Sequence, residues 1–528
     1  MRKILSLLFI LPVAYSCSVA QNPSKYANLI TEESSKEYLT ILASKEFAGR
    51  GTGQEGGKKT VKYAEDQFKS FGLQPIVNGS YLQQVPLLQT SYKVDSFTLG
   101  NQTLVYGQDF YVQGDNSTAS FNANEIVFVG YGIQDDKFNE LKNTDIAGKV
   151  VLLINEGEPV DAEGKSIITG TTSKSTWSSS RFKRLQEIMK LNPKLILAAS
   201  SQNEEMIKRM NNRGMMGRVA LDKGNANQNQ RVSIPVVHIK TSLADHLLAQ
   251  ANTSVEKFKA QNLATPAQPQ VIKSALNASM GVKNEKFSDP NVIGYIEGTD
   301  LKNEVVVVCG HWDHDGILPD GTFFPGADDN GSGTVGVVEI AKAFAKAKKE
   351  GKGPRRSILF IALAAEEKGL LGSQYYVENP IIPLTQTVAC LNIDMIGRID
   401  DKHLNGDHNY IHVIGVNKLS TDLKPIVEKA NAETKMKLDY DYDHPEEPMR
   451  LYYRSDHYNF AKNGIPSLFF FSGLHPHYHT PEDTVDKIDF PMMVKRERLI
   501  FFTAWEIANR DKKPVVDMSL EEAQGTGR

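Results

Sequence analysis

The sequence predicts an α/β protein with a mostly parallel mixed sheet flanked by helices, interrupted by an inserted, mainly β domain. Two observations predict this fold class. After about residue 290, continuous apolar runs alternate with helical patterns, which is typical of parallel strands buried on both faces. Between about residues 120 and 240, shorter apolar runs bounded by Gly, Asn or Asp interrupt that order.

The length and composition are those of a globular protein with more than one domain. At 528 residues the chain is too long for one compact core, so two or three domains are expected. Hydrophobic residues make up 40% and charged residues 23%, as in ordinary folded proteins. A net charge of −3 gives no global field that would select nucleic acid or an anionic membrane. Nothing in the sequence indicates an oligomeric state.

The amino terminus has the pattern of a secretory signal. Arg2 and Lys3 precede an apolar run, residues 4–15, that is too short to span a bilayer as a permanent anchor. Small residues favour cleavage after Ala20. The alternative is lipidation of Cys17, although the Leu of a lipobox is missing before it. We therefore expect an exported protein, periplasmic or secreted, without a transmembrane segment, and anchored by lipid if Cys17 is modified.

The elements of the first half are predicted from periodicity. Residues from about 28 to 75 are expected to be helical, with a break at Ala48–Gly53 and a resumed helix at Lys58–Phe71. The insertion is expected to contain one helix, Arg181–Leu191. It is also expected to contain four strands, which are Glu125–Val129, Lys149–Ile154, Lys194–Ala199 and Ser233–Ile239. Two prolines and few apolar residues mark a boundary at Gln261–Gln270.

The second half alternates strands and helices. The predicted strands are Val305–Cys309, Ile358–Ala364, Val388–Ile393, Ile411–Ile414 and Ser467–Phe471, and the predicted helices include Thr334–Lys348, Leu423–Glu433 and Val494–Ala508. Cys309 and Cys390 lie inside apolar runs, and we interpret them as buried free thiols. The chain thus divides into a signal peptide (1–20), the first part of a main domain (21–115), the insertion (116–270), the rest of the main domain (271–510) and a flexible tail (511–528).

Polar residues directly follow three of the predicted strands. These residues are His311, the adjacent pair Glu366 and Glu367, and Asp394. In open α/β sheets, binding sites form at the carboxyl ends of strands, so these side chains are expected to share one edge. Each also has a plain structural interpretation, as a polar turn, a solvated acidic loop or a helix cap. The carboxylate of Asp313, two residues after His311, can reach the distal nitrogen of the His311 ring and so orient it.

Two further segments complete a possible metal-binding set. Asp329 lies among glycines in Gly326–Gly333, where a turn with a helix cap is the plain interpretation, but a carboxylate has two oxygens with which to bridge two cations. His479 belongs to the loop His475–Asp483, which contains three alternating histidines. Together the five positions supply two His and three carboxylates, and this mixed nitrogen and oxygen set suits zinc.

The chain resembles the M28 family of co-catalytic zinc peptidases, most of which are aminopeptidases. The resemblance covers about residues 290–510 and rests on the motifs Gly310–His314, Gly326–Gly333, Ala365–Gly369, Asn392–Met395, Tyr453–His457, Gly464–Pro466 and Tyr478–Thr484. It implies two zinc ions per chain. One would be held by His311 and Asp394 and the other by Glu367 and His479, with Asp329 bridging the two.

The same resemblance implies roles for the neighbours of the ligands. Glu366 would be the general base and Asp313 would orient His311. Asp328 would be a supporting residue, and three histidines would not be ligands, namely His314, His475 and His477. The run Ser455-Asp456-His457 contains triad residue types, but consecutive residues at one helix start cannot form a nucleophilic triad.

The insertion resembles a PA (protease-associated) domain. The likeness rests on Val127–Ile133, Asp145–Val151 and Ile234–Val237, whereas Lys174–Arg184 departs from the usual pattern. Such a domain usually acts as a lid or as a wall that limits substrate access, and a plain scaffold is an equal alternative.

These features lead us to expect an exported metallopeptidase that acts on peptides or proteins with a free N-terminus. A metal-bridging hydroxide would attack the peptide bond, with Glu366 as general base. The alternatives are a glutaminyl-cyclase-like acyltransferase, which works with one zinc, and a non-catalytic binding ectodomain; the complete ligand set argues against both. Carboxypeptidase action stays open because Arg450 or Arg454 is available for a substrate carboxylate. Carboxylate-rich sites also admit cobalt or manganese.

Overall fold

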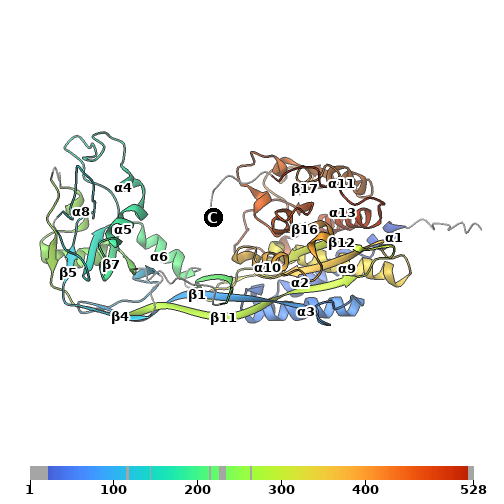
Figure 1. The fold of residues 1–528 in the computed structure, drawn as a ribbon, viewed down its shortest axis with the longest axis horizontal. Helices are drawn as coiled ribbons and strands as arrows, with labels where there is room; N and C mark the ends of the chain where they lie inside the picture. Colours follow the sequence, from blue (N-terminus) through green and yellow to red (C-terminus); the bar gives the residue numbers. More distant parts are fainter. Residues whose placement is uncertain are drawn as a thin grey trace, which may run out of the picture.

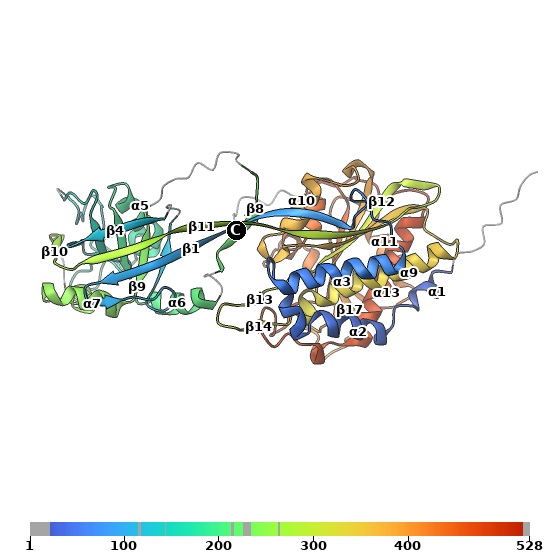
Figure 2. The same cartoon turned by 90° about the horizontal axis from the view of Figure 1, so that it is seen from below.

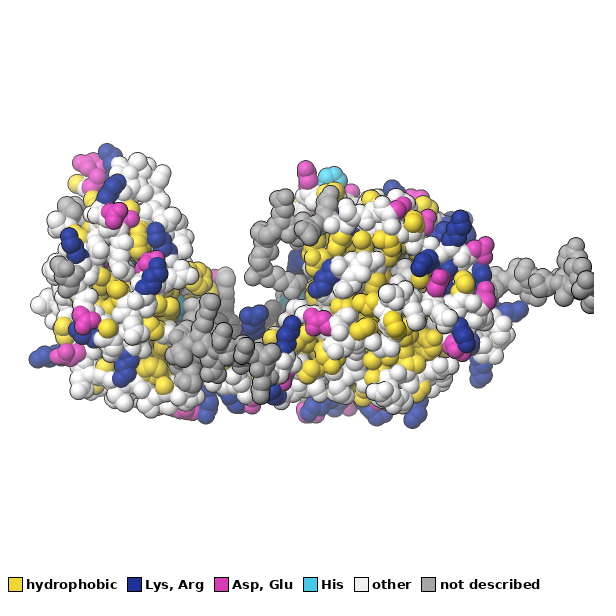
Figure 3. Space-filling view, viewed as in Figure 1, with side chains coloured by type: hydrophobic (Ala, Val, Ile, Leu, Met, Phe, Trp, Pro, Cys, Tyr) yellow, Lys and Arg dark blue, Asp and Glu magenta, His cyan; other side chains and the backbone are white. Residues whose placement is uncertain are grey.

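The computed structural model has two lobes joined by a long, two-stranded ribbon (Figure 1, Figure 2). It describes residues 22–114, 118–142, 144–212, 216–224, 234–261 and 265–520. The predicted signal peptide, its cleavage site and Cys17 lie outside these residues. Over the described residues, no helix is both long enough and apolar enough to cross a bilayer. On the face drawn in Figure 3, acidic and basic side chains are interspersed over both lobes.

The larger lobe, called the main lobe below, is built on an eleven-stranded mixed sheet. Its order is β18-β17-β19-β16-β12-β15-β11-β1-β2, with β4 paired to β11 and β8 paired to β1. The strands β12 and β16 pair in parallel with their neighbours β15 and β19. The bounds are β1 Leu82–Leu99, β2 Gln102–Thr103, β4 Ala119–Ala123, β8 Arg218–Leu221, β11 Leu276–Ile296, β12 Leu301–His311, β15 Arg356–Leu363, β16 Thr387–Ile393, β17 Tyr410–Ile414, β18 Lys437–Asp439 and β19 Ser467–Phe471.

Helices cover both faces of this sheet, as the fold-class prediction requires, and that prediction is confirmed. Alternate residues of β12 enter different cores: Val306 and Val308 pack on one side, whereas Val305, Val307 and Cys309 pack on the other. Burial on both faces explains why such strands read as continuous apolar runs. The first side is covered by α1 Pro23–Ala27, α2 Glu32–Leu42, α3 Glu55–Phe71, α9 Gly333–Lys349, α11 Leu423–Asn431 and α13 Phe490–Asn509, and the second by α10 Leu371–Glu378 and α12 His457–Ala461.

The two cysteines are buried free thiols, as predicted. Cys309 on β12 and Cys390 on β16 are neighbours across the sheet, and their sulfur atoms lie 3.6 Å apart without a disulfide. The final described residues, 511–520, contain no helix or strand. Asp517 nevertheless accepts hydrogen bonds from the backbone and hydroxyl of Thr421, which ties this segment to the main lobe.

The smaller lobe, called the inserted lobe below, has its own six-stranded sheet in the order β10-β5-β6-β7-β9-β3. Its bounds are β3 Phe110–Gln113, β5 Ile126–Phe128, β6 Val150–Ile154, β7 Leu195–Ala199, β9 Val236–Ile239 and β10 Gln270–Ile272. Helices accompany the strands, so the lobe is not β alone: α4 Thr176–Ser179, α5 Arg181–Met189, α6 Asn203–Asn212, α7 Thr241–Leu248 and α8 Val255–Lys259. This lobe has separate apolar cores.

The ribbon that connects the lobes consists of β1 and β11, which periodicity did not predict. The two strands are 18 and 21 residues long and pair antiparallel from Leu82 opposite Val292 to Leu99 opposite Leu276. Their inner ends pack in the core of the main lobe, and their outer ends pack in the core of the inserted lobe. Because both strands run through both lobes, the domain boundaries at 115 and 270 stay predictions.

Candidate metal centre

The strand order brings the predicted ligands to one edge of the main sheet. Strand β12 lies between β16 and β15, and all three are parallel, so their carboxyl ends meet at the same edge. His311 is the last residue of β12, and Asp394 directly follows β16. Glu366 and Glu367 lie in the turn after β15.

Asp329 and His479 reach this edge from loops. Asp329 lies just before α9, and His479 lies in the loop that follows β19. The backbone at Ala365, Met395 and His479 is in the left-handed region, with φ values of 53, 54 and 53°. This conformation is costly for residues with a side chain and is found mostly where the surroundings hold a functional group in place.

The five predicted metal ligands form two groups that share Asp329. In the first, His311 Nε2 lies 3.6 Å from Asp329 Oδ1 and 3.4 Å from Asp394 Oδ1. In the second, His479 Nε2 lies 3.0 Å from Asp329 Oδ2 and 3.4 Å from Glu367 Oε2. Each oxygen of Asp329 therefore faces a different histidine, which is the arrangement a bridging carboxylate needs.

The geometry fits two bound cations. Tetrahedral ligands at about 2.0–2.1 Å from a zinc ion are roughly 3.3 Å apart, close to the four distances above. Asp329 Oδ2 and Asp394 Oδ1 are buried, and neither accepts a well-aligned hydrogen bond from a described residue. Burying a carboxylate oxygen without a partner is costly, and a cation offsets that cost. The mixed imidazole and carboxylate donors suit zinc.

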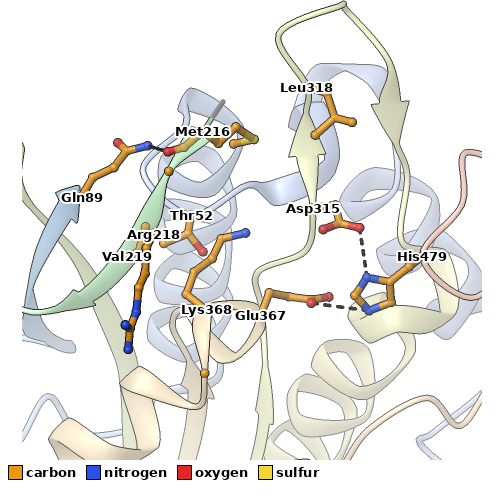
Figure 4. A pocket seen from close by; sticks show the side chains of 12 residues that line it. Thr52, Gln89, Met216, Arg218, Val219, Asp315, Leu318, Glu367, Lys368 and His479 are labelled. Atoms are coloured by element: carbon orange, nitrogen blue, oxygen red, sulfur yellow. Dashed lines mark hydrogen bonds and ion pairs between the residues drawn. The ribbon is translucent and has the colours of Figure 1, made fainter. Parts of the chain in front are cut away.

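Both ligand histidines are oriented through the ring nitrogen that faces away from the shared carboxylate. His311 Nδ1 lies 3.0 Å from the backbone carbonyl oxygen of Asp313 and 3.8 Å from its carboxylate. Asp313 therefore orients His311 through its carbonyl group, whereas the sequence analysis assigned this contact to the carboxylate. His479 Nδ1 lies 3.1 Å from Asp315 Oδ2 (Figure 4). The sequence analysis missed Asp315, although it follows Asp313 at the next alternate position.

The Asp313 carboxylate holds the turn that carries the two glutamates. It accepts hydrogen bonds from the backbone N–H groups of Glu366 (2.9 Å) and Glu367 (3.3 Å) and from the hydroxyl of Thr52 (2.9 Å). Glu366 Oε2 lies 3.9 Å from His311 Nε2, beside the first ligand group. Burial raises the pKa of Glu366 well above its ordinary value; neighbouring carboxylates add to the rise, whereas His311 opposes it.

Ser455 supports Asp394 and takes no part in a nucleophilic triad. Its hydroxyl donates to Asp394 Oδ2 at 2.7 Å and accepts a hydrogen bond from the Asn392 amide at 2.8 Å. Asp456 accepts a hydrogen bond from the Ser373 hydroxyl, on α10. These contacts fix the ligand oxygen of Asp394 on the side facing His311.

Residues 291–504, which contain all five predicted metal ligands, match peptidase family M28. This domain belongs to peptidase family M28. Among curated proteins, aminopeptidase YwaD of Bacillus subtilis (strain 168) is 30% identical over 242 residues, 42% of this chain and 46% of that protein. A probable leucine aminopeptidase of Arthroderma benhamiae is 31% identical over 244 residues, 45% of this chain and 63% of that protein. The chain thus spans about half to under two thirds of these relatives.

Solved structures share the fold of the M28 domain and of the insertion. An aminopeptidase from Aneurinibacillus sp. strain AM-1 has a TM-score of 0.53 at 19% identity and covers 94% of this chain and 98% of its own. A zinc aminopeptidase from Bacillus subtilis has a TM-score of 0.53 at 18% identity and covers 92% and 96%. At these identities the likeness concerns the fold, and its extent is consistent with an M28 domain that carries a PA-like insertion.

Arg50 supports the M28 site from outside residues 291–504. The side chain is fully buried and donates hydrogen bonds of 2.6–3.3 Å to five backbone carbonyl groups, those of Leu42, Trp312, Pro325, Gly326 and Asp329. One guanidinium thereby ties the end of β12 to the loop that carries the shared ligand. The sequence analysis recorded Ala48–Gly53 only as a break in a helix, because the partners of Arg50 are far away in the chain.

His314 contacts the M28 site, although the sequence analysis left it out of the ligand set. Its Nδ1 lies 3.0 Å from Glu367 Oε1 and 3.7 Å from Asp329 Oδ2. Burial lowers the pKa of His314 to about 4, so the ring is neutral at ordinary pH. A neutral ring that donates from Nδ1 to Glu367 leaves the other Glu367 oxygen facing His479. We therefore describe His314 as a positioning residue.

The other residues left out of the ligand set hold loops of the M28 domain. Asp328 Oδ1 accepts a hydrogen bond of 2.6 Å from the backbone of Gly397, and its Oδ2 lies 3.3 Å from His475 Nε2. His477 Nδ1 lies 3.0 Å from the guanidinium of Arg398. These contacts connect the loops after β16 and β19 behind the metal ligands.

A second group of His and Asp residues is a hydrogen-bonded network. His403 Nδ1 and His412 Nε2 lie 2.7 and 2.8 Å from the two oxygens of Asp400, and His412 Nδ1 lies 3.1 Å from Asp439 Oδ1. Both contacts with Asp400 have hydrogen-bond geometry, so ring protons occupy the space between the heavy atoms. Burial lowers the pKa of His412, but hydrogen bonds to the two carboxylates outweigh it and raise that pKa overall.

Proposed function

We propose that this chain is an exported zinc aminopeptidase that releases N-terminal residues from peptides or proteins. The observation that carries the proposal is the pair of ligand groups around Asp329, with Glu366 beside the first of them. The relatives named as aminopeptidases support the same class of reaction. Export rests on the amino-terminal sequence pattern alone.

Two zinc ions would be held by the five ligands, with Asp329 bridging. Zinc, when bound, polarises a carbonyl oxygen and lowers the pKa of water at the site. Glu366 is placed to accept a proton from the attacking water and to return it to the leaving amine. Its backbone N–H is held by the Asp313 carboxylate, so the side chain starts from a fixed position.

The preference for N-terminal residues follows from the groups that can receive a free α-amine. The site gathers four carboxylates, those of Asp329, Glu366, Glu367 and Asp394, around only two ligand histidines. Two bound zinc ions would balance these four negative charges, so a free α-amine would be recognised through its lone pair and N–H groups and not through net charge. An acylated N-terminus lacks that free lone pair.

The test is a panel of aminoacyl anilides and N-acetylated peptides, assayed before and after dialysis against a chelator. We expect release of free amino acids from unblocked substrates, loss of that activity with the chelator and its return with zinc. Internal cleavage of the acetylated peptides would contradict the aminopeptidase assignment. Cyclisation of N-terminal glutamine at one zinc per chain would instead identify an acyltransferase.

A further inference from the structure

A pocket opens beside Glu367 and His479 (Figure 4). Its volume of about 490 Å³ is within the range of small-ligand sites. One wall is the loop that carries Asp315 and Leu318, and the opposite wall is the segment 216–219, at the start of β8. A segment that belongs to the insertion in the chain therefore borders the space next to the metal ligands.

The insertion's part of this wall is held firmly against β1. Arg218 pairs with Thr90 in the antiparallel register of β8 and β1. The Gln89 amide donates to the carbonyl oxygen of Met216. Gly217 has a φ of +75°, and a Cβ at this position would lie 2.3 Å from the Thr90 carbonyl oxygen, so only glycine permits the approach. The wall is thus part of the main sheet.

Two cationic side chains line the pocket, Lys368 and Arg218. Lys368 is half-buried and Arg218 is exposed, and neither side chain has an ion pair or hydrogen bond within the part of the chain that the structure describes. In Figure 4 the ammonium group of Lys368 is directed toward Thr52, into the space between β8 and the opposite loop. The acids on the metal side, Asp315 and Glu367, both contact His479.

The pocket therefore has the predicted metal ligands on one side and cations that no described residue pairs on the other. A short peptide presents matching groups, an amino end for the metal side and a negative carboxylate for the cations. Opposite potentials on the two partners fix the orientation of binding and speed the encounter. A carboxylate also satisfies cations that no described residue pairs, and Arg and Lys are suited to that partner.

We propose that Lys368 forms a subsite for a substrate carboxylate on the leaving side of the cleaved bond. In Figure 4 the guanidinium of Arg218 is directed away from the space that the Lys368 ammonium group enters, so Lys368 carries the subsite. This inference rests on the proposed aminopeptidase function and narrows its substrate class. The carboxylate has two possible sources with the same chemistry, the free C-terminus of a di- or tripeptide and an Asp or Glu side chain just after the cleaved bond.

The test compares kcat and KM within three pairs of peptides. The first pair is a neutral tripeptide as its free acid and as its C-terminal amide, and the second is a neutral pentapeptide in the same two forms. The third pair is two amidated tripeptides that carry Glu or Gln in the second position. We expect the carboxylate form to have a KM lower by roughly 1.5-fold to fivefold, the range of a solvent-accessible ion pair. Lys368→Met should remove this advantage with little change in kcat, Arg218→Met should keep most of it, and added salt should weaken it.

The matched control is Lys349→Met. Lys349 is exposed in the last turn of the 17-residue α9, about 25 Å along the helix from the metal end, so this variant should keep the advantage. An advantage confined to the free-acid tripeptide identifies the C-terminus, and one confined to Glu identifies the side chain; both support the subsite. Equal KM values for all acid and neutral pairs would overturn the subsite and leave the aminopeptidase function standing. Failure to cleave any unblocked peptide would contradict the aminopeptidase function itself.

Discussion

Glu366 and Glu367 are neighbours in the chain but occupy different environments. Glu367 faces His479, whereas Glu366 lies beside His311 without being one of the five ligands. Replacing Glu366 by Gln keeps the shape and removes the proton acceptor. We expect Glu366→Gln to retain two zinc ions per chain and to lose about 10²–10⁴-fold in kcat. Elemental analysis and anilide hydrolysis check the two parts, and a metal-loaded variant with near wild-type turnover would remove the general-base role.

Asp315 is expected to act on metal affinity through His479. Its carboxylate fixes the ring orientation at 3.1 Å, and loss of such a partner usually weakens metal binding by roughly 10–100-fold. Asp315→Asn should therefore release one of two zinc ions at a lower chelator concentration than the wild type. Asp320→Asn, an exposed acid on the following loop, is the control and should titrate like the wild type. Equal release by the two variants would show that Asp315 does not support the ligand.

Local motifs predicted the residues that meet at the candidate metal centre, but not the residues that hold them in place. His311, Asp394 and the two glutamates stand directly after apolar strands, so their place at one edge follows from the strand pattern. Arg50 carries no such signal, because its acceptors are backbone carbonyl groups that any sequence supplies. The contact of Asp313 with His311 was predicted through the carboxylate, since sequence spacing does not tell which oxygen of a residue faces a ring.

At the scale of elements, burial decided which strands were predictable. Strand β12 is apolar from Val305 to Cys309, where both of its faces are covered, and so its pattern stands out. The middle of β11, residues 283–286, is exposed in the ribbon between the lobes and reads Lys-Asn-Glu-Lys. Because no second layer covers this part of β11, its sequence has no row of apolar residues from which a strand could be predicted. Its pairing with β1 is a long-range contact that periodicity does not report.

The network around His412 ties strand β17 to Asp400 and to Asp439 on β18, and its contribution to stability depends on pH. The pKa of His412 is raised from 6.5 in the folded protein. Its contribution to stability is therefore complete below pH 6.5 and is lost as pH rises through the raised pKa. The pKa values of Asp400 and Asp439 are lowered from 3.8, so the contribution of these two carboxylates to stability is complete above pH 3.8 and is lost as pH falls through the lowered pKa values. The network should therefore stabilise most between these limits.

The measurement is urea unfolding of wild type and His412→Gln across pH. We expect the difference in unfolding free energy to be largest between about pH 4 and 6.5 and to shrink on both sides. His408→Gln, at a half-exposed histidine that lies 3.6 Å from Asp489, serves as control and should show a small difference. A difference for His412→Gln that stays constant with pH would mean that the ring contributes packing and not charge.

The two lobes have separate cores, and among the described residues the candidate metal centre lies in the main lobe. Zinc stabilises only the structure that binds it, by about 2.7 kcal/mol when its free concentration is a hundred times the Kd. We therefore expect calorimetry to show two unfolding transitions, of which a chelator lowers one. The Asp329→Ala variant should resemble the chelator-treated protein. Equal shifts of both transitions would show that the ribbon couples the lobes into one cooperative unit.

The ribbon also bears on how such a protein is assembled from parts. The chain leaves the main lobe along β1 and returns beside it along β11, with Thr90 opposite Asn284. For the main lobe, everything beyond that pair is the tip of a hairpin, and its length and content leave the strand order from β18 to β1 unchanged. The inserted lobe can therefore be gained, lost or exchanged without a change in the order of the strands that carry the candidate metal centre. The one connection that an exchange must preserve is β8, the strand that returns from the inserted lobe to the wall beside the metals.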